Sequence, residues 1–415
     1  MSGSTPPEPD RSDRNNPMLY RDSPNLNIFL EEICASLRER ASCATIVAPR
    51  RYHEDLSLAF RKYAENFLNL VYTVDVTGGE SLLGALIPRF CEGDSPPSLT
   101  SLFDLPTRDG ATLLVKYPPE NFSGEFLTFA EEAASRSRTA ATTNQPLLWS
   151  MVFIVPPDAD FPAEDAGFAR FYWWGKRYQS DLEYIIEREI IPRDYGNPAS
   201  RWFYALCKGV CEGAPELVPN LLAKEPAGLD DIVDVLRSSP VYNEENRRIA
   251  LDYLEKYSPP HTRTALPQDF AAEAWAAGIL DIGCQGQPRL HPAALLAARG
   301  AEYVEKLVVR GQCQVYIPMV PEATRVITES AERKLGPDWN RGIEEETLEI
   351  GGLHYHLNNT LSGWSRGLRE EIELAKYWRE LRNELAHYKM IEARLALFAV
   401  AKLDEFKRGQ AGKDA

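Results

Sequence analysis

The side chains best suited to chemistry gather near the C-terminus, in the stretch WRELRNELAHYK at residues 378–389. Arg382, Asn383 and His387 lie there within six positions. A histidine exchanges a proton near neutral pH, and an arginine presents a planar fork of N–H groups that fits a phosphate. An asparagine can orient either group by hydrogen bonding. Together these residue types suit proton transfer at a phosphate group.

An amphipathic helix is expected to position these side chains. Four apolar residues fall on one narrow stripe at helical spacing, and that stripe would face a helical core. The stripe consists of Leu374, Trp378, Leu381 and Leu385. Arg382 falls at its edge, whereas Asn383 and His387 fall one turn apart on the face away from it. Arg382 and His387 diverge by about 140° on a straight helix, so they converge only if the arginine wraps around or a second copy of the helix faces the first.

The hexapeptide RNELAH is similar to the R-x4-H signature of the HEPN superfamily, in which a polar residue, often Asn, follows the Arg. Arg382, Asn383 and His387 match this signature position by position. HEPN proteins are typically metal-independent ribonucleases that dimerise so that two motifs face each other, and many are toxins or antiviral effectors in bacteria. The resemblance implies an endoribonuclease that binds RNA, forms a homodimer through a C-terminal bundle and needs no metal or other cofactor.

RNA suits these residues chemically because its 2′-hydroxyl is a built-in nucleophile. Cleavage then needs proton transfer and stabilisation of charge on the phosphate. The expected catalytic roles are general acid or base for His387 and stabilisation of the phosphorane charge for Arg382. Asn383 would orient the histidine or the phosphate.

Four regions are expected along the chain. Residues 1–26 are rich in Pro, Ser, Asp and Asn and predict a disordered N-terminus. Residues 27–192 alternate apolar runs with helix-compatible segments, which predicts a three-layer α/β domain with a parallel sheet. Its five strand candidates are 43–49, 70–76, 111–118, 147–157 and 168–174. Residues 193–300 predict an all-α or winged-helix-like lid, and residues 301–410 predict a helical bundle.

The order of elements in 27–192 resembles that of AAA-like and STAND-type P-loop ATPases. The first strand candidate runs into APRRYHEDL, which has no glycine and no Lys-Thr pair. The turn at Gly78 and Gly79 lacks the lysine, and Lys116 stands where an ATPase places its magnesium-binding Asp. The resemblance therefore implies a degenerate NTPase-like domain that regulates the C-terminal bundle and binds a regulatory protein partner.

Composition excludes several other classes. A net charge of -15 argues against a protein that coats nucleic acid through a general basic field. Seven scattered cysteines indicate a reducing compartment, and the pair Cys207 and Cys211 is expected to be structural. Neither a signal peptide nor an apolar run of about 18 residues is evident, so a cytoplasmic protein without a membrane span is expected. His291, His354 and His356 are interpreted as structural.

Other interpretations stay open at this point. The three motif residues could form a solvated helix face without further role. Both halves of the chain could be interaction modules of a non-catalytic regulatory protein. Arg170, Lys176 and Arg177 lie among aromatic residues in GFARFYWWGKRY and could grip nucleic acid, although a buried edge strand ending in a basic turn is the commoner explanation. A transcription regulator using residues 225–300 lacks a concentrated basic patch.

Overall fold

The computed structural model describes most of the chain and divides it into two compact units. The described residues are 23–39, 43–68, 70–75, 84, 111–116, 128, 131–136, 138–139, 149–159, 168–191, 197–225, 228–256, 261–336, 338–339, 349–360 and 367–411. The first unit, here the sheet unit, comprises Met1–Asp181 and Asp252–Leu290. The second, the helical unit, comprises Leu182–Leu251 and His291–Ala415. The expected lid at 193–300 is therefore divided between the two units.

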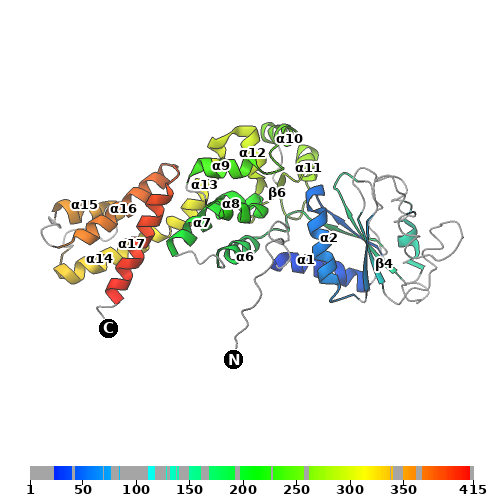
Figure 1. Cartoon of the computed structure of the whole chain (residues 1–415), viewed down its shortest axis with the longest axis horizontal. Helices are drawn as coiled ribbons and strands as arrows, with labels where there is room; N and C mark the ends of the chain where they lie inside the picture. Colours follow the sequence, from blue (N-terminus) through cyan, green and yellow to red (C-terminus); the bar gives the residue numbers. More distant parts are fainter. Residues whose placement is uncertain are drawn as a thin grey trace, which may run out of the picture. The chain divides into compact units, whose positions relative to one another are not determined.

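A five-stranded parallel sheet forms the core of the sheet unit, as the sequence predicts (Figure 1). Its strands are β1 (Cys43–Val47), β2 (Leu70–Asp75), β3 (Ala111–Lys116), β4 (Trp149–Val155) and β5 (Phe168–Tyr172). Their spatial order is β2-β3-β4-β1-β5. In register, Val47 lies between Val155 and Tyr172. The apolar runs of β1 and β4 are buried, which is typical of central strands in a parallel sheet.

Helix α1 (Pro24–Glu39) begins earlier than the predicted boundary at residue 27. Ser23 accepts a hydrogen bond at its Oγ from the Leu26 N–H, at 3.4 Å, and Pro24 occupies the first helical position. Both are favoured residues for starting a helix. Leu26 is 1% exposed, so the buried face of α1 already includes a residue assigned to the disordered lead-in. Helix α2 (His53–Ala64) packs against β2, β3 and β4.

A small segment far along the chain completes the sheet unit. It contains α11 (Asp269–Ala276) and an antiparallel pair formed by β6 (Leu280–Ile282) and β7 (Pro288–Leu290). The indole N–H of Trp174, just after β5, donates to the carbonyl oxygens of Thr262 and Ala265 at 2.9 and 3.0 Å. These contacts attach residues 261–290 to the end of the sheet's fifth strand.

The helical unit contains the remaining helices. They are α7 (Asn197–Val210), α8 (Val218–Lys224), α9 (Leu229–Arg237), α12 (Pro292–Arg299), α13 (Ala301–Tyr316), α14 (Met319–Leu335), α15 (Ile350–Tyr355), α16 (Arg369–Ala386) and α17 (Ala393–Ala411). The chain passes from one unit to the other within α6 (Gln179–Ile190), within α10 (Glu244–Glu255) and between β7 and α12. Within the described residues, no helix is both long enough and apolar enough to cross a bilayer.

Helices α7 and α13 pack with their backbones in direct contact. A Cβ on Gly311 would lie 2.2 Å from the carbonyl oxygen of Ala205, and one on Gly209 would lie 2.3 Å from that of Leu307. Helix α13 therefore packs on a helix from the segment predicted as a lid.

Replacing Gly311 with alanine should destabilise the protein. The clash involves backbone atoms, so the two helices must separate, and overpacking of this kind costs about 1–3 kcal/mol. Urea unfolding measures the difference. Gly409→Ala is the matched control, because nothing lies within 4 Å of its Cβ position in α17. Equal destabilisation by the two substitutions would contradict the packing argument.

Candidate active site

Helix α16 positions the motif by burying the opposite face. Its predicted apolar stripe is buried, with Trp378 and Leu381 at 0% exposure, Leu385 at 2% and Leu374 at 3%. Helices α14, α15 and α17 pack around α16 (Figure 1). The face that carries the motif is therefore directed away from the core of the bundle.

Arg382 lies on this outer face beside two acceptors. Its Nη2 forms an ion pair with Oε2 of Glu349 at 2.9 Å, and its Nη1 donates to Oδ1 of Asn383 at 3.4 Å. The arginine side chain is 41% exposed and the glutamate 70% exposed. An ion pair this exposed contributes no more than about 1 kcal/mol. A phosphate that approaches Arg382 can therefore displace Glu349 at small cost.

His387 lies at the end of α16 rather than inside the helix. It is the C-cap residue, with φ -92° and ψ 12°, and its backbone N–H donates to the carbonyl oxygens of Asn383 and Glu384. Its side chain is exposed. Among the described residues, no side-chain hydrogen bond or ion pair joins His387 to Arg382 or Asn383. One chain thus brings the arginine and the asparagine together but leaves the histidine apart from them.

A second histidine, for which the sequence suggested a structural role, lies beside α16. Nδ1 of His354, on α15, lies 3.0 Å from Nη1 of Arg379 on α16. Arg379 is one turn before Arg382, and its side chain passes over Gly351 of α15. Burial, with the nearby cations of Arg379 and Lys376, lowers the pKa of His354. Because the pKa is lowered and Arg379 is a donor, Nδ1 of His354 is an acceptor in a neutral imidazole. The sequence of α16 carries no signal for this contact, because His354 lies on another helix.

Acidification should lower the stability of the fold through His354. As pH falls below the ordinary histidine pKa of 6.5, the unfolded chain takes up this proton before the folded chain does. The free energy of unfolding therefore falls between pH 7 and pH 5. His354→Gln keeps an acceptor for Arg379 but cannot titrate, so the variant should show a shallower pH dependence in urea unfolding. An unchanged slope would contradict the assignment.

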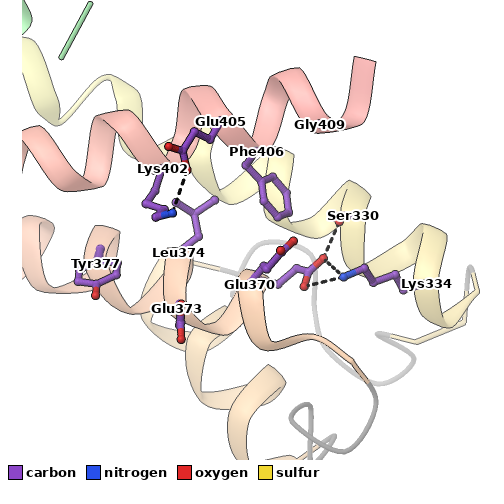
Figure 2. A pocket seen from close by; sticks show the side chains of 11 residues that line it. Ser330, Lys334, Glu370, Glu373, Leu374, Tyr377, Lys402, Glu405, Phe406 and Gly409 are labelled. Atoms are coloured by element: carbon purple, nitrogen blue, oxygen red, sulfur yellow. Dashed lines mark hydrogen bonds and ion pairs between the residues drawn. The ribbon is translucent and has the colours of Figure 1, made fainter. Parts of the chain in front are cut away.

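A cavity of about 330 Å³ lies between α14, α16 and α17 (Figure 2). Its wall includes four carboxylates, those of Glu370, Glu371, Glu373 and Glu405. Glu371 is fully buried and accepts a hydrogen bond from the Ser330 hydroxyl at 2.7 Å and an ion pair from Lys334 at 2.8 Å. Since two lysines face four carboxylates there, this cavity repels phosphate. It lies along the first half of α16, apart from the motif on the last turn.

The carboxyl edge of the parallel sheet is where an α/β fold usually binds its ligand. Strand β1 ends at Val47 and α2 begins at His53, with a short 3₁₀ helix at Arg50–Tyr52 between them. This connection contains no glycine-rich turn. Lys116, at the end of β3, forms an ion pair with Glu54 of α2 at 2.8 Å. The turn at Gly78 and Gly79 lies outside the described residues.

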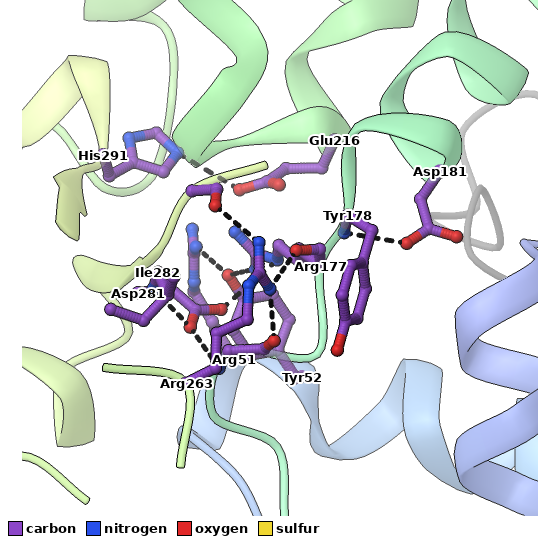
Figure 3. Close-up of polar contacts among 12 residues, drawn as sticks. Arg51, Tyr52, Arg177, Tyr178, Asp181, Glu216, Arg263, Asp281, Ile282 and His291 are labelled. Carbon is purple, nitrogen blue, oxygen red and sulfur yellow. Dashed lines mark hydrogen bonds and ion pairs between the residues drawn. The ribbon is translucent and has the colours of Figure 1, made fainter. Parts of the chain in front are cut away.

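The chain's own side chains fill this edge beside β1 and β5 (Figure 3). Arg177, 2% exposed, forms an ion pair with Asp281 of β6 at 3.4 Å. Oδ1 of Asp281 accepts from the backbone N–H groups of Gly175 and Ile282 at 2.9 and 2.7 Å. The hydroxyl of Tyr52 accepts hydrogen bonds from Arg51 and Arg177.

Arg263 closes the same cluster from the segment 261–290. Its Nη1 donates to the carbonyl oxygens of Gly175 and Arg177, and its Nη2 donates to those of Gly283 and Cys284 at 2.9 and 3.2 Å. Its guanidinium also lies over the ring of Tyr178. The basic and aromatic residues after β5 therefore make contacts within the sheet unit. This agrees with the alternative of an edge strand that ends in a basic turn.

Lys176 also makes contacts within the sheet unit. Its Nζ lies 3.5 Å from Oε2 of Glu32 and over the ring of Phe29.

In the described part of the chain, no three His, Cys, Asp or Glu side chains are grouped as metal ligands. No protein-family model matches the chain, and no curated protein matches it.

Proposed function

We propose that this chain is a metal-independent endoribonuclease of the HEPN type. It acts as a homodimer through its C-terminal helices, in the cytoplasm, as an effector of the kind used in bacterial antiphage defence or toxin systems. The sheet unit serves as a degenerate NTPase-like module that regulates the nuclease through a protein partner. Arg382, Asn383 and His387 are the catalytic residues.

One observation carries this proposal. The last turn of α16 presents Arg382 and Asn383 in contact with each other on the outer face, and His387 follows directly at the exposed helix end. The buried stripe on the other face fixes the helix, so the three polar side chains are available to a substrate. A second copy of α16 that faced the first would supply the histidine that one chain leaves apart.

The proposed reaction needs only these groups and the RNA. The 2′-oxygen attacks the adjacent phosphorus while a general base takes its proton, and the 5′-oxygen of the next nucleotide leaves with a proton from a general acid. A dimer provides two copies of His387, one for each proton transfer. Arg382 stabilises the charge on the pentavalent phosphorane. The products are a 2′,3′-cyclic phosphate and a 5′-hydroxyl end.

The test uses the purified full-length chain with single-stranded RNA in EDTA. Cleavage that leaves 5′-hydroxyl ends supports the proposal, as does a dimer in sedimentation. Cleavage that stops in EDTA and returns with Mg²⁺ contradicts it, because the 2′-hydroxyl route has no need of a metal.

A non-catalytic regulatory protein is the second candidate, and two contacts favour it. Arg382 already has a carboxylate partner in Glu349, and the sheet edge is filled by Arg177, Asp281 and Arg263. If this candidate is correct, the full chain cleaves no RNA, whether a co-purified partner protein is present or has been removed.

A further inference from the structure

The end of α16 has an unusual residue at its turning point. The N–H of Tyr388 donates to the Leu385 carbonyl and the N–H of Lys389 donates to that of Glu384, each at 3.0 Å. This pair of bonds is the Schellman arrangement that ends many helices. The residue at its centre, Tyr388, has φ +54°. Glycine is common at this position because a Cβ is sterically disfavoured in the left-handed region.

The ring of Tyr388 makes no contact within the described residues that would offset the cost of this backbone conformation. It is 83% exposed, more than any other large hydrophobic side chain in the described part of the chain. Within that part it has no ring contact and its hydroxyl has no hydrogen bond. The other two non-glycine residues with positive φ, Glu225 and Asp269, are polar. A glycine would end the helix equally well, so stability does not account for the tyrosine.

The position of the ring suggests a different use. Tyr388 directly follows His387, and Arg382 and Asn383 lie on the preceding turn. Lys389, also exposed, follows it. Proteins that bind single-stranded RNA combine aromatic rings, on which unpaired bases stack, with cations that bind the neighbouring phosphates. The end of α16 presents both within a few residues.

We propose that Tyr388 is a base-stacking residue, whose ring binds an unpaired nucleobase of single-stranded RNA next to the phosphate at Arg382 and His387. This inference rests on the proposed function and names its substrate class: RNA with an unpaired base at the cleavage position. Stacking of one base on an aromatic side chain corresponds to roughly 5- to 150-fold in affinity.

The experiment measures binding separately from cleavage. The probe is a fluorescein-labelled 12-nucleotide single-stranded RNA with 2′-O-methyl groups, which cannot be cleaved through its 2′-oxygens, and the readout is fluorescence anisotropy with the full-length chain. Tyr388→Phe should keep the affinity within about twofold, whereas Tyr388→Ala and Tyr388→Gly should lower it roughly 5- to 150-fold. The glycine variant also relieves the backbone, so its loss of binding cannot come from unfolding. Tyr242→Ala, at another exposed tyrosine of the helical unit, should change nothing.

Each other outcome has a defined meaning. Wild-type affinity in the alanine and glycine variants overturns the inference, as does a failure of the wild-type chain to bind the probe. A change from dimer to monomer in Tyr388→Ala also overturns it, because the ring would then be a contact between chains. If the chain cleaves no RNA but its binding of the probe depends on the Tyr388 ring, the nuclease assignment is refuted and the stacking role is supported.

Discussion

Replacing His387 with alanine should reduce RNA cleavage by about 10²- to 10⁴-fold, the range expected when a general acid or base is removed. The histidine lies at an exposed helix end, and among the described residues its side chain has no partner. The substitution should therefore leave the unfolding free energy within about 0.5 kcal/mol of the wild-type value. Single-turnover cleavage in EDTA and urea unfolding test the two expectations. Full activity of His387→Ala would remove the basis of the nuclease assignment.

Mixing two inactive variants tests whether the site is shared between chains. Arg382→Ala should lose about 10²- to 10³-fold in cleavage, as expected for loss of one charge-stabilising donor. A dimer of one Arg382→Ala chain and one His387→Ala chain keeps one arginine and one histidine, on different chains. If the groups act across the dimer, mixing and re-equilibrating the two variants restores part of the activity. Activity equal to the mean of the separate variants would show that one histidine and one arginine on different chains do not form a working site.

Replacing Asp281 with alanine should cost about 3–5 kcal/mol of stability, because it leaves the buried guanidinium of Arg177 without its carboxylate. Arg177 is 2% exposed, and Arg51 and Arg263 lie in the same cluster, so three like charges would remain without the carboxylate of Asp281. Two backbone N–H groups, those of Gly175 and Ile282, would lose their acceptor as well. This cost is a large part of the 5–15 kcal/mol that stabilises a typical domain. Denaturant unfolding, followed by tryptophan fluorescence, measures it.

Two further variants separate charge from hydrogen bonding in this cluster. Asp281→Asn keeps an oxygen for the two N–H groups but removes the charge, so it should cost less than Asp281→Ala. Asp158→Asn is the surface control, since its ion pair with Arg50 has side chains 53% and 51% exposed and is worth at most about 1 kcal/mol. Similar losses for Asp281→Ala and Asp158→Asn would contradict the view that the buried pair holds the sheet unit together.

The sheet was predictable from the sequence because its signal is local. Buried parallel strands need continuous apolar residues, and the five apolar runs mark all five strands to within a few residues. The start of α1 was also marked locally, by Ser23 and Pro24, but the polar composition around them outweighed that signal. The membership of 261–290 in the sheet unit was not predictable. It depends on pairs such as Arg177 and Asp281, which are far apart in sequence.

The candidate site was predictable in part. The apolar stripe of α16 and the exposed motif face follow from helical periodicity. The helix end at Ala386 does not, because no glycine or proline follows His387 and the turn uses a tyrosine with positive φ. The partners Glu349 and His354 come from another helix, so the spacing within α16 carries no information about them.

The filled part of the sheet edge, beside β1 and β5, limits how a ligand can change the sheet unit. A ligand shifts a conformational equilibrium only by the difference between its affinities for the two states. Beside β1 and β5, the arginines already have acceptors in Asp281, in the Tyr52 hydroxyl and in carbonyl oxygens, so a nucleotide phosphate would gain little there. A change in the cellular ratio of nucleoside triphosphate to diphosphate would then have little effect on the part of the edge beside β1 and β5. Under the proposed function, the signal at this part of the sheet unit would be the arrival or departure of another macromolecule at its surface.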